Sequence, residues 1–290
     1  MSDVNPPTIP ADPGFRHAPV GVQDYGRIFA AETVGTAVLI IGGPGTAILA
    51  ANAVGNTVGI ALGFGVAVLI MTYVIGPISG CQINPAVTLA MFLSRKITGA
   101  HAVFAVLGQI IGGIGGAAIV YGIASGQDDY QRGLFAANVW TYQGQFFGLG
   151  STIVVEVVFS ALLVMVMLFS TADDGRLAPG VGGAIAGLTV MLIYLVTIPV
   201  DNGGANPIRS LATALFADTS TDALQQLWAF IVFPLIGAVI GVVLYLMLTD
   251  ERLEDTLLAE VPGLSEVRDV LEHGADGAVG GVEKTLDRND

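Results

Sequence analysis

The chain has 290 residues, of which 53% are hydrophobic and only 12% are charged. An ordinary soluble domain carries roughly 25% charged residues, about twice as many. This composition excludes a disordered chain, a nucleic-acid-binding protein and most soluble enzymes, and it indicates one polytopic membrane domain. The formal net charge of −13 is unusual for such a protein, so its location along the chain matters.

The start of the chain, residues 1–25, is polar and proline-rich. No basic stretch is followed there by an apolar one, so we do not expect a cleaved signal peptide. The single cysteine, Cys81, excludes an intramolecular disulfide, and the three histidines are too scattered for a metal cluster. We therefore expect neither a cofactor nor a metal site.

Six segments are apolar enough to cross a bilayer as helices, which takes about 20 residues each. Glycines spaced four apart, such as Gly112 with Gly116 and Gly237 with Gly241, suit close helix packing in lipid. The alternative is that glycine is simply common in membrane helices. The six spans are roughly 27–51, 58–78, 101–124, 148–170, 179–200 and 225–248.

Lysine and arginine residues predict how the spans are oriented, because they favour the cytoplasmic side. With six spans, basic residues before the first, after the second, between the fourth and fifth, and after the sixth all fall on one side. That side is predicted to be cytoplasmic, with both termini inside. The exceptions are Arg132 and Arg209.

Two connections do not have the character of loops. Residues 79–93 (SGCQINPAVTLAMFL) and 201–216 (DNGGANPIRSLATALF) each have a short polar lead, then Asn-Pro, then about ten largely apolar residues. Ten residues are too few to span and too apolar for water, which predicts two re-entrant half-helices. Asn84 and Asn206 are expected to cap them, with proline in the first turn.

The two halves of the chain repeat each other. Glu32 in the first span corresponds to Glu156 in the fourth, 124 residues later, and Asn84 corresponds to Asn206, 122 residues later. Each half holds three spans, and because three is odd the second half must be inverted in the membrane. The fold class is thus an all-α polytopic membrane protein of six transmembrane helices plus two re-entrant half-helices in an inverted repeat.

The sequence resembles the aquaporin, or major intrinsic protein, family, and within it most resembles the bacterial aquaporin Z branch. The resemblance covers about residues 26–249 and rests on AAETVGTAVLIIGGPGTAILA, SGCQINPAVTLA, GQIIGGIGGAAIVYGIASG, IPVDNGGANPIRS and LQQLWAFIVFP. The first motif is complete (Asn84, Pro85, Ala86). The second, Asn206, Pro207 and Ile208, has isoleucine for the usual alanine, and Gln82 stands where the family usually has histidine.

This resemblance implies a passive channel that conducts water in single file and excludes protons and ions. It also implies a multi-pass protein of the plasma membrane and a homotetramer with one pore per subunit, whose partners are lipid, further copies of itself, and water or small neutral solutes. A channel for glycerol is the alternative. An enzyme is not expected, since the sequence has no cluster of nucleophilic residues or of residues at metal-ligand spacing. An ion channel would need charged partners along the path, and an ammonia channel would need paired pore histidines; the sequence offers neither.

The two asparagines would offer amide donors to water at the pore centre, where the positive ends of both half-helices oppose cations. The leads before them would present backbone carbonyls to water, from Gly80, Cys81, Gln82, Gly204 and Ala205. The plain alternative is that each Asn-Pro only caps a helix.

An arginine inside the membrane is costly, which marks Arg209 as a functional candidate; snorkelling to the interface is its alternative. The resemblance implies an outer selectivity filter of Phe64, Tyr194, Gly203 and Arg209. Relatives selective for water commonly carry histidine at the Tyr194 position. Ser210 resembles water channels, whereas Ile231, in place of a common tryptophan, leans toward glycerol.

Glu32 and Glu156 are carboxyl groups within apolar spans, and they need hydrogen bonds. The resemblance implies that they brace the re-entrant loops, with an ion relay as the rival role. Cys81 corresponds to Gly203 in the repeat and is expected to face the inner vestibule, where a mercurial would slow permeation; the alternative is an inert small residue.

The acidity is concentrated at the end of the chain. Residues 1–25 carry −2, residues 26–249 carry −3, and residues 250–290 carry −8. We therefore expect a polar cytoplasmic segment (1–25), a channel domain (26–249, with halves of about 26–123 and 148–249) and an acidic cytoplasmic tail (250–290). The tail is expected to be solvated, with a docking or gating helix around Leu264–Leu271 as the alternative, and the acidity is interpreted as a solubility adaptation.

Overall fold

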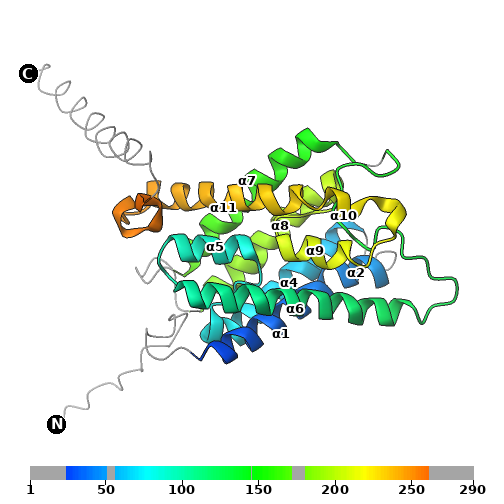
Figure 1. Ribbon diagram of the computed structural model, residues 1–290, viewed down its shortest axis with the longest axis horizontal. Coiled ribbons are helices and arrows are strands. Elements are labelled where there is room, and N and C mark those ends of the chain that lie inside the picture. Colours follow the sequence, from blue (N-terminus) through cyan, green and yellow to red (C-terminus); the bar gives the residue numbers. More distant parts are fainter. Residues whose placement is uncertain (1–23, 51–55, 145, 172–179, 261–290) are drawn as a thin grey trace, which may run out of the picture.

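The computed structural model of the chain describes residues 24–50, 56–144, 146–171 and 180–260, and within these ranges it contains helices and no strands. Six helical stretches are long and apolar enough to cross a membrane: 25–49, 57–79, 99–124, 149–170, 182–201 and 223–247. The six predicted spans are therefore confirmed within a few residues, and Figure 1 shows them running side by side.

The elements of the two halves follow the same order. The first half holds α1 (Tyr25–Gly42), α2 (Pro44–Leu49), α4 (Thr57–Ser79), α5 (Pro85–Leu93) and α6 (Gly99–Ala124). The second holds α7 (Leu149–Ser170), α8 (Gly182–Asp201), α9 (Pro207–Ala214), α10 (Ala223–Gln226) and α11 (Ala229–Met247), with a 3₁₀ turn at Thr219–Thr221.

The first span is interrupted between α1 and α2, which the sequence pattern did not predict. Gly43 separates the two helices, and Pro44 opens the second. A proline lacks the N–H that would continue the ladder of hydrogen bonds, so it begins a new helix instead. A Cβ atom at position 43 would lie 2.2 Å from the Phe64 ring, so the glycine leaves room for that side chain.

The two half-helices, α5 and α9, are nine and eight residues long. Asn84 caps α5 by accepting from the N–H of Ala86, and Asn206 caps α9 by accepting from those of Ile208 and Arg209. Both asparagines have extended backbone and are followed by proline. The local sequence thus starts each helix where the pattern predicted.

Glycines allow the helices of each half to touch along their backbones. In α6, a Cβ at Gly112 would lie 2.1 Å from the carbonyl oxygen of Thr33 in α1. In α11, a Cβ at Gly237 would lie 2.5 Å from the carbonyl oxygen of Val157 in α7, so the predicted glycine contacts are real. Gly65 and Gly187, 122 residues apart, would each clash at 2.7 Å with the other's carbonyl, which marks where α4 and α8 cross.

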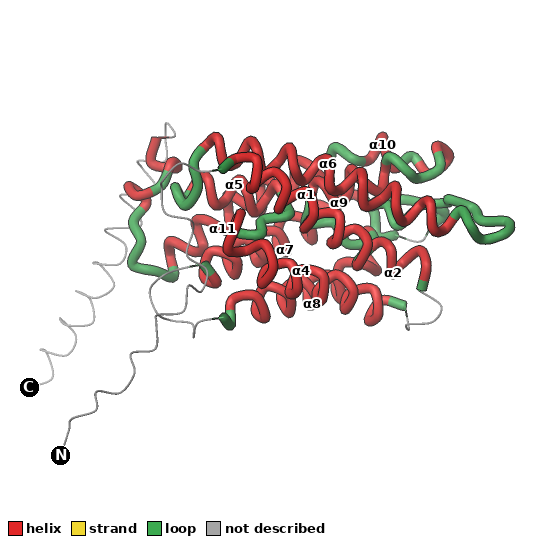
Figure 2. Tube along the Cα trace, turned by 90° about the horizontal axis from the view of Figure 1, so that it is seen from below, coloured by secondary structure: helices red, strands yellow, loops and turns green. Residues whose placement is uncertain are grey.

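The half-helices join the two halves of the molecule. α5 belongs to the first half but packs against α7 and α11 of the second, while α9 packs against α6 of the first. In Figure 1 they follow one another end to end between α6 and α11, and Figure 2 shows both enclosed by the long helices. This exchange is consistent with an inverted repeat in which the half-helices enter from opposite sides.

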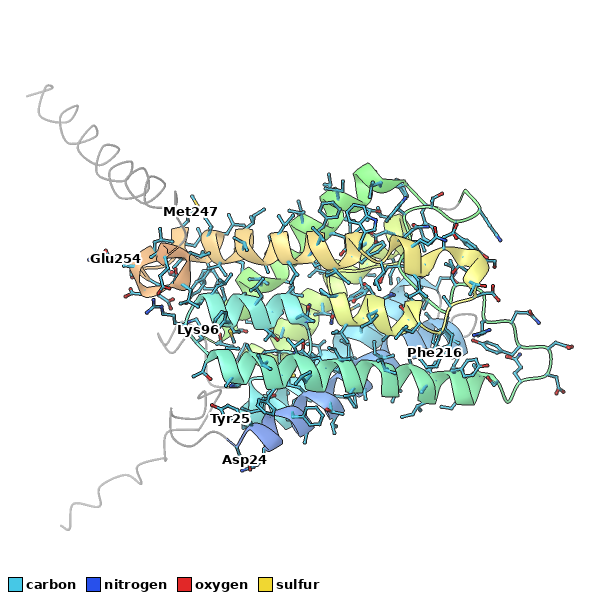
Figure 3. The ribbon with its side chains drawn as sticks, viewed as in Figure 1. Asp24, Tyr25, Lys96, Phe216, Met247 and Glu254 are labelled. Carbon is cyan, nitrogen blue, oxygen red and sulfur yellow. The ribbon has the colours of Figure 1, made fainter. Side chains whose placement is uncertain are left out.

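Residues 250–260 fold back onto the end of the bundle instead of extending into solvent. Leu258 and Thr256 are buried there, Lys96 Nζ lies 3.1 Å from Glu251 Oε1, and Arg95 pairs with Glu260 at 2.5 Å. Figure 3 places Tyr25, Lys96, Met247 and Glu254 at one end of the molecule and Phe216 away from it. The described start of the tail is therefore packed, which the charge pattern did not predict; residues 1–23, Arg176 and 261–290 lie outside the described residues.

Candidate functional site

The tips of the two half-helices meet inside the bundle. Asn84 Nδ2 donates to the carbonyl of Ala205 at 2.8 Å, and Asn206 Nδ2 donates to the carbonyl of Ile83 at 2.9 Å. Each asparagine is thus held by the lead of the opposite half-helix. Because an amide carries two N–H donors, each of them keeps one that these bonds do not use.

The two leads share an unusual backbone. Cys81, Ile83, Asn202 and Ala205 all have positive φ although they are not glycines, and Gly80 and Gly203 have it as well. Paired by the 122-residue offset, the residues are Gly80 with Asn202, Cys81 with Gly203, and Ile83 with Ala205. Such conformations cost about 1–3 kcal/mol each and persist only where surrounding contacts impose them. The repeat therefore reproduces the strained loop geometry in both halves.

A cavity lies beside the asparagines. Its lining includes Asn84, Asn206, Cys81 and Gln82, together with apolar side chains of α1, α4, α5, α7 and α8, and it reaches Tyr194. It offers about 30 Å³ to the centres of water molecules, more than the roughly 10–15 Å³ that one water needs. Cys81 is buried against it, with Sγ 3.8 Å from Thr72 Oγ1.

The backbone carbonyls predicted to line the pore differ, between the two leads, in whether they accept hydrogen bonds from the protein. Gly204 accepts from the Tyr194 hydroxyl at 3.0 Å, and Ala205 accepts from Asn84. In the part of the chain that the structure describes, no protein donor reaches the carbonyls of Gly80, Cys81 or Gln82. A backbone oxygen has two lone pairs, so the first lead is the freer of the two to accept hydrogen bonds from water.

Gln82, at the family's usual histidine position, is held on both ends of its amide. Nε2 donates to the carbonyl of Ser79 at 3.1 Å, and Oε1 accepts from Thr88 Oγ1 at 2.9 Å. The ring of His101, at the start of α6, lies beside it with Nε2 3.2 Å from Gln82 Nε2. A histidine from a different helix thus lies next to Gln82. The position of His101 in the sequence did not predict this contact.

Arg209 is buried and its guanidinium is tied down by neighbouring loops. Nη1 donates to Asn138 Oδ1 at 2.5 Å and to Thr213 Oγ1 at 3.4 Å, and Nη2 donates to the carbonyl of Asn202 at 2.8 Å. Among the described residues, Nε has no hydrogen-bond partner. The side chain is therefore directed into the protein and does not extend to the surface.

The four residues expected at the filter lie together. The rings of Phe64 and Tyr194 are stacked, with centroids 3.6 Å apart and an angle of 9° between planes. The guanidinium carbon of Arg209 lies 5.6 Å from the Phe64 ring centre, and a Cβ at Gly203 would lie 2.7 Å from the Tyr194 ring. Rings in van der Waals contact leave no room for water between them, so in this structure the two aromatics are closed on each other.

The two buried glutamates both accept hydrogen bonds from the leads, but unequally. Glu32 accepts from Ser79 Oγ, Gln109 Nε2 and the backbone N–H groups of Gln82 and Ile83, at 2.6–2.9 Å. Glu156 accepts from the N–H of Ala205 at 2.8 Å, and its Oε1 has no partner among the described residues.

Sequence reasoning missed two residues of this site. Asn138 lies in the connection 125–147, where no motif marks it, yet its side chain accepts from both Arg209 and Ser210 and donates to the carbonyl of Asp201. Asp201 opens the second lead and is fully buried. Its signal was available: it is an acid at the membrane-buried end of an apolar span, 122 residues after Ser79.

Comparison with known proteins identifies the family. Residues 22–245 match the model of the major intrinsic protein family. The chain belongs to the major intrinsic protein family. It is 39% identical to aquaporin Z of Photorhabdus laumondii over 233 residues, which cover 78% of this chain and 99% of that protein. It is 40% identical to aquaporin Z of Brucella melitensis over 225 residues, covering 74% and 95%.

Solved structures agree on the fold. The aquaglyceroporin of Plasmodium falciparum superposes with a TM-score of 0.67 at 21% identity, covering 76% of this chain and 95% of that one. As a member of the major intrinsic protein family with six spanning helices, the chain is a multi-pass membrane channel protein. The predicted family and fold class are thereby confirmed.

Proposed function

We propose that this member of the family is a passive channel that conducts water along osmotic gradients and excludes protons and ions. The observation that carries this is the meeting of two half-helix N-termini at Asn84 and Asn206, beside a cavity large enough for water. Each asparagine has a free N–H that can hold a water oxygen. The similarity to two bacterial aquaporin Z proteins supports the same function.

Exclusion of cations follows from the charges that face the path. The N-terminal ends of α5 and α9 carry partial positive charge and converge from opposite sides, and Arg209 adds a full positive charge close by. A neutral water passes such a site with little penalty, whereas a hydrated proton or sodium ion is repelled by all three.

Passage through the outer end requires Tyr194 to leave its stack with Phe64. Tyr194 lines the cavity beside the asparagines, and its hydroxyl donates to the carbonyl of Gly204. Rotation of one side chain would therefore open the route past Arg209. Side-chain rotations are far faster than the transport of solutes across a vesicle membrane, so the stack can regulate flow without a change of fold.

A glycerol channel is the second candidate, and Gly203 is the observation that favours it. This residue has no side chain next to Tyr194. Once the tyrosine ring rotates, the opening is wider than one with a larger residue at position 203. The named aquaglyceroporin neighbour supports the shared fold.

The remaining features of the proposal concern the setting of the channel. The chain is placed in the plasma membrane with both termini cytoplasmic, because arginine and lysine gather at that end, and it forms a homotetramer with one pore per subunit. The channel domain is assigned to residues 26–249, with the loop-bracing roles given to Glu32 and Glu156.

Proteoliposomes test the proposal. Purified protein in sealed vesicles is subjected to an osmotic step with an impermeant solute, and shrinkage is followed by light scattering; glycerol steps and a trapped pH-sensitive dye run in parallel. Fast water flow without proton leak supports the proposal, and equally fast glycerol flow selects the alternative. Rates equal to those of empty vesicles contradict both.

The matched control is Gly115→Ala. A methyl group at this position would meet nothing within 4 Å, so this variant should match the unsubstituted chain in every assay.

A further inference from the structure

Comparison of the two halves shows that the buried glutamate of the second half has fewer hydrogen-bond donors than that of the first. Glu32 receives four donors, from Ser79, Gln82, Ile83 and Gln109, so both of its oxygens are satisfied. Glu156, its counterpart 124 residues later, receives a single donor from the described residues, the N–H of Ala205. A buried carboxyl oxygen without a donor is strongly unfavourable, so the second half must satisfy Glu156 in another way.

Asp201 occupies the position that Ser79 occupies in the first half. The two are 122 residues apart, and each accepts the N–H of the residue two positions later: Cys81 to Ser79 Oγ at 3.2 Å, Gly203 to Asp201 Oδ1 at 3.1 Å. Ser79 then donates its hydroxyl hydrogen to Glu32 at 2.6 Å. An ionised aspartate has no hydrogen to donate.

Each of the two acids has one buried carboxyl oxygen without a partner among the described residues. Glu156 Oε1 and Asp201 Oδ2 have no donor among the described residues, and the two carboxyl groups lie within hydrogen-bonding reach of one another. The Thr152 hydroxyl, one turn before Glu156, also has no hydrogen-bond partner among the described residues and lies near Asp201. All three residues are almost wholly buried: Glu156 is 1% exposed, and Asp201 and Thr152 are 0% exposed.

The charged and titratable groups around the pair are few. Arg209 from α9 and the Tyr194 phenol from α8 act on both carboxyl groups. Two buried carboxylates in contact cannot both be ionised at low cost, and such pairs share one proton elsewhere in proteins. One proton leaves the pair with a single negative charge, which balances Arg209.

We propose that Asp201 and Glu156 share one proton, and that this carboxyl–carboxylate hydrogen bond is the second half's replacement for the Ser79–Glu32 bond. Asp201 is thereby a positioning residue for the filter. Its carboxyl oxygen Oδ1 accepts the N–H of Gly203, and its backbone carbonyl, at the same corner of the chain, accepts from Asn138 Nδ2, whose Oδ1 in turn accepts from Arg209. Glu156 fixes the N–H of Ala205, so the pair sets the whole second lead.

Gly204 shows how closely the pair is fitted to the loop. A Cβ atom at this position would lie 2.0 Å from Glu156 Oε1, so the glycine is what lets the carboxyl group reach the lead. Its counterpart in the first half is Gln82, whose N–H donates to Glu32. The two halves therefore solve the same bracing problem with different chemistry.

Infrared difference spectroscopy of the reconstituted full chain tests the shared proton directly. The unsubstituted chain minus Asp201→Ser should show the loss of one protonated carboxyl C=O band that shifts in D₂O, because serine supplies its own hydrogen and leaves Glu156 ionised. Glu156→Gln should remove the same band. The double variant should show no additional loss, since the pair holds only one proton.

Two spectroscopic results would overturn the proposal. No loss of the band in either single variant means that both groups are ionised. A double variant that loses more of the protonated carboxyl absorption than either single variant means that each acid carries its own proton. Neither result depends on whether the protein conducts water.

Osmotic shrinkage rates then test the positioning role, and this part rests on the proposed function. Asp201→Ser and Asp201→Asn each supply a donor and should keep the water permeability of the unsubstituted chain, whereas Asp201→Ala supplies none and should lose most of it. Permeability retained by the alanine variant, or lost equally in all three, overturns the positioning role. An unsubstituted chain that does not conduct water contradicts the proposed function and leaves the infrared result standing.

Discussion

The two ends of the path are built on the same backbone and lined by different side chains. The residues proposed for the filter at the outer end are Phe64, Tyr194, Gly203 and Arg209. Their counterparts at a 122-residue offset are Ala186, Thr72, Cys81 and Val87, of which Cys81 and Val87 line the cavity. The outer end thus has two stacked rings and a cation, whereas the inner end has small neutral side chains.

This contrast teaches that the fold supplies symmetry and that selectivity resides where the symmetry is broken. The strained leads, the asparagine caps and the helix crossings recur in both halves. The cavity borders Cys81 and Val87 of one half, and it also borders Tyr194, one ring of the aromatic stack. Substituting an outer residue by its inner counterpart is therefore the most direct way to test the comparison.

The largest effect is expected from Arg209→Val, which gives the outer end the inner residue. Removing the buried charge should raise proton leak by about tenfold or more, because each 1.4 kcal/mol of lost repulsion corresponds to a factor of ten. The trapped pH dye in proteoliposomes measures it. Arg209→Lys, which keeps the charge, is the control, and an unchanged leak in the valine variant would show that the half-helix ends alone exclude protons.

The bracing glutamates should differ in their contribution to stability. Glu32→Gln places an amide against four donors, and bonds to a charged group contribute about 1.5–3 kcal/mol each, so its melting temperature in detergent should fall clearly. The melting temperature of the Glu156→Gln variant should fall less, since the new amide can donate to Asp201. Thermal unfolding followed by circular dichroism compares them, and equal decreases would speak against the asymmetry of the two halves.

Opening the aromatic stack should increase flow. Tyr194→Thr installs the inner counterpart, and since an aromatic pair contributes about 0.5–1.5 kcal/mol, its release corresponds to a rise in open pores of about two- to tenfold. Stopped-flow shrinkage measures water, and glycerol uptake should increase alongside it. Tyr194→Phe keeps the ring but loses the bond to Gly204, so its water permeability should lie between those of the unsubstituted chain and Tyr194→Thr. No change in either variant would mean that the stack does not limit flow.

The smallest effect concerns Cys81. A mercurial should slow water flow partially, because the thiol borders the cavity but is fully buried and must be reached through it. The test compares treated and untreated vesicles, with Cys81→Ser as the insensitive control. Inhibition that persists in the serine variant would place the reactive group elsewhere.

The sequence alone was sufficient for the spans, the half-helices and the repeat, because these follow from apolar length, Asn-Pro start signals and a fixed offset. The interruption at Gly43 was not predicted, since the apolar pattern runs through it unbroken. The packing of residues 250–260 was not predicted either, because charge composition says little about where a single leucine such as Leu258 can be buried.

Within the site, what the repeat encodes could be predicted, and what crosses between elements could not. Asn84, Asn206 and Arg209 stand in motifs. Asn138 comes from a long connection, and His101 reaches Gln82 from a separate helix, so only three-dimensional proximity reveals them. Asp201 was visible in the sequence, but its significance depends on comparing it with Ser79 by position.

The reciprocal bonds of the two asparagines have a consequence for how the chain is made. Asn84 needs the carbonyl of Ala205, and α5 packs against α7 and α11, so the first re-entrant segment lacks its partners when it leaves the ribosome. It has to wait, at the membrane or within the insertion machinery, until nearly the whole second half has been synthesised. The first re-entrant segment therefore reaches its final contacts only once the second half is present, and a chain truncated before residue 205 lacks the carbonyl to which Asn84 donates.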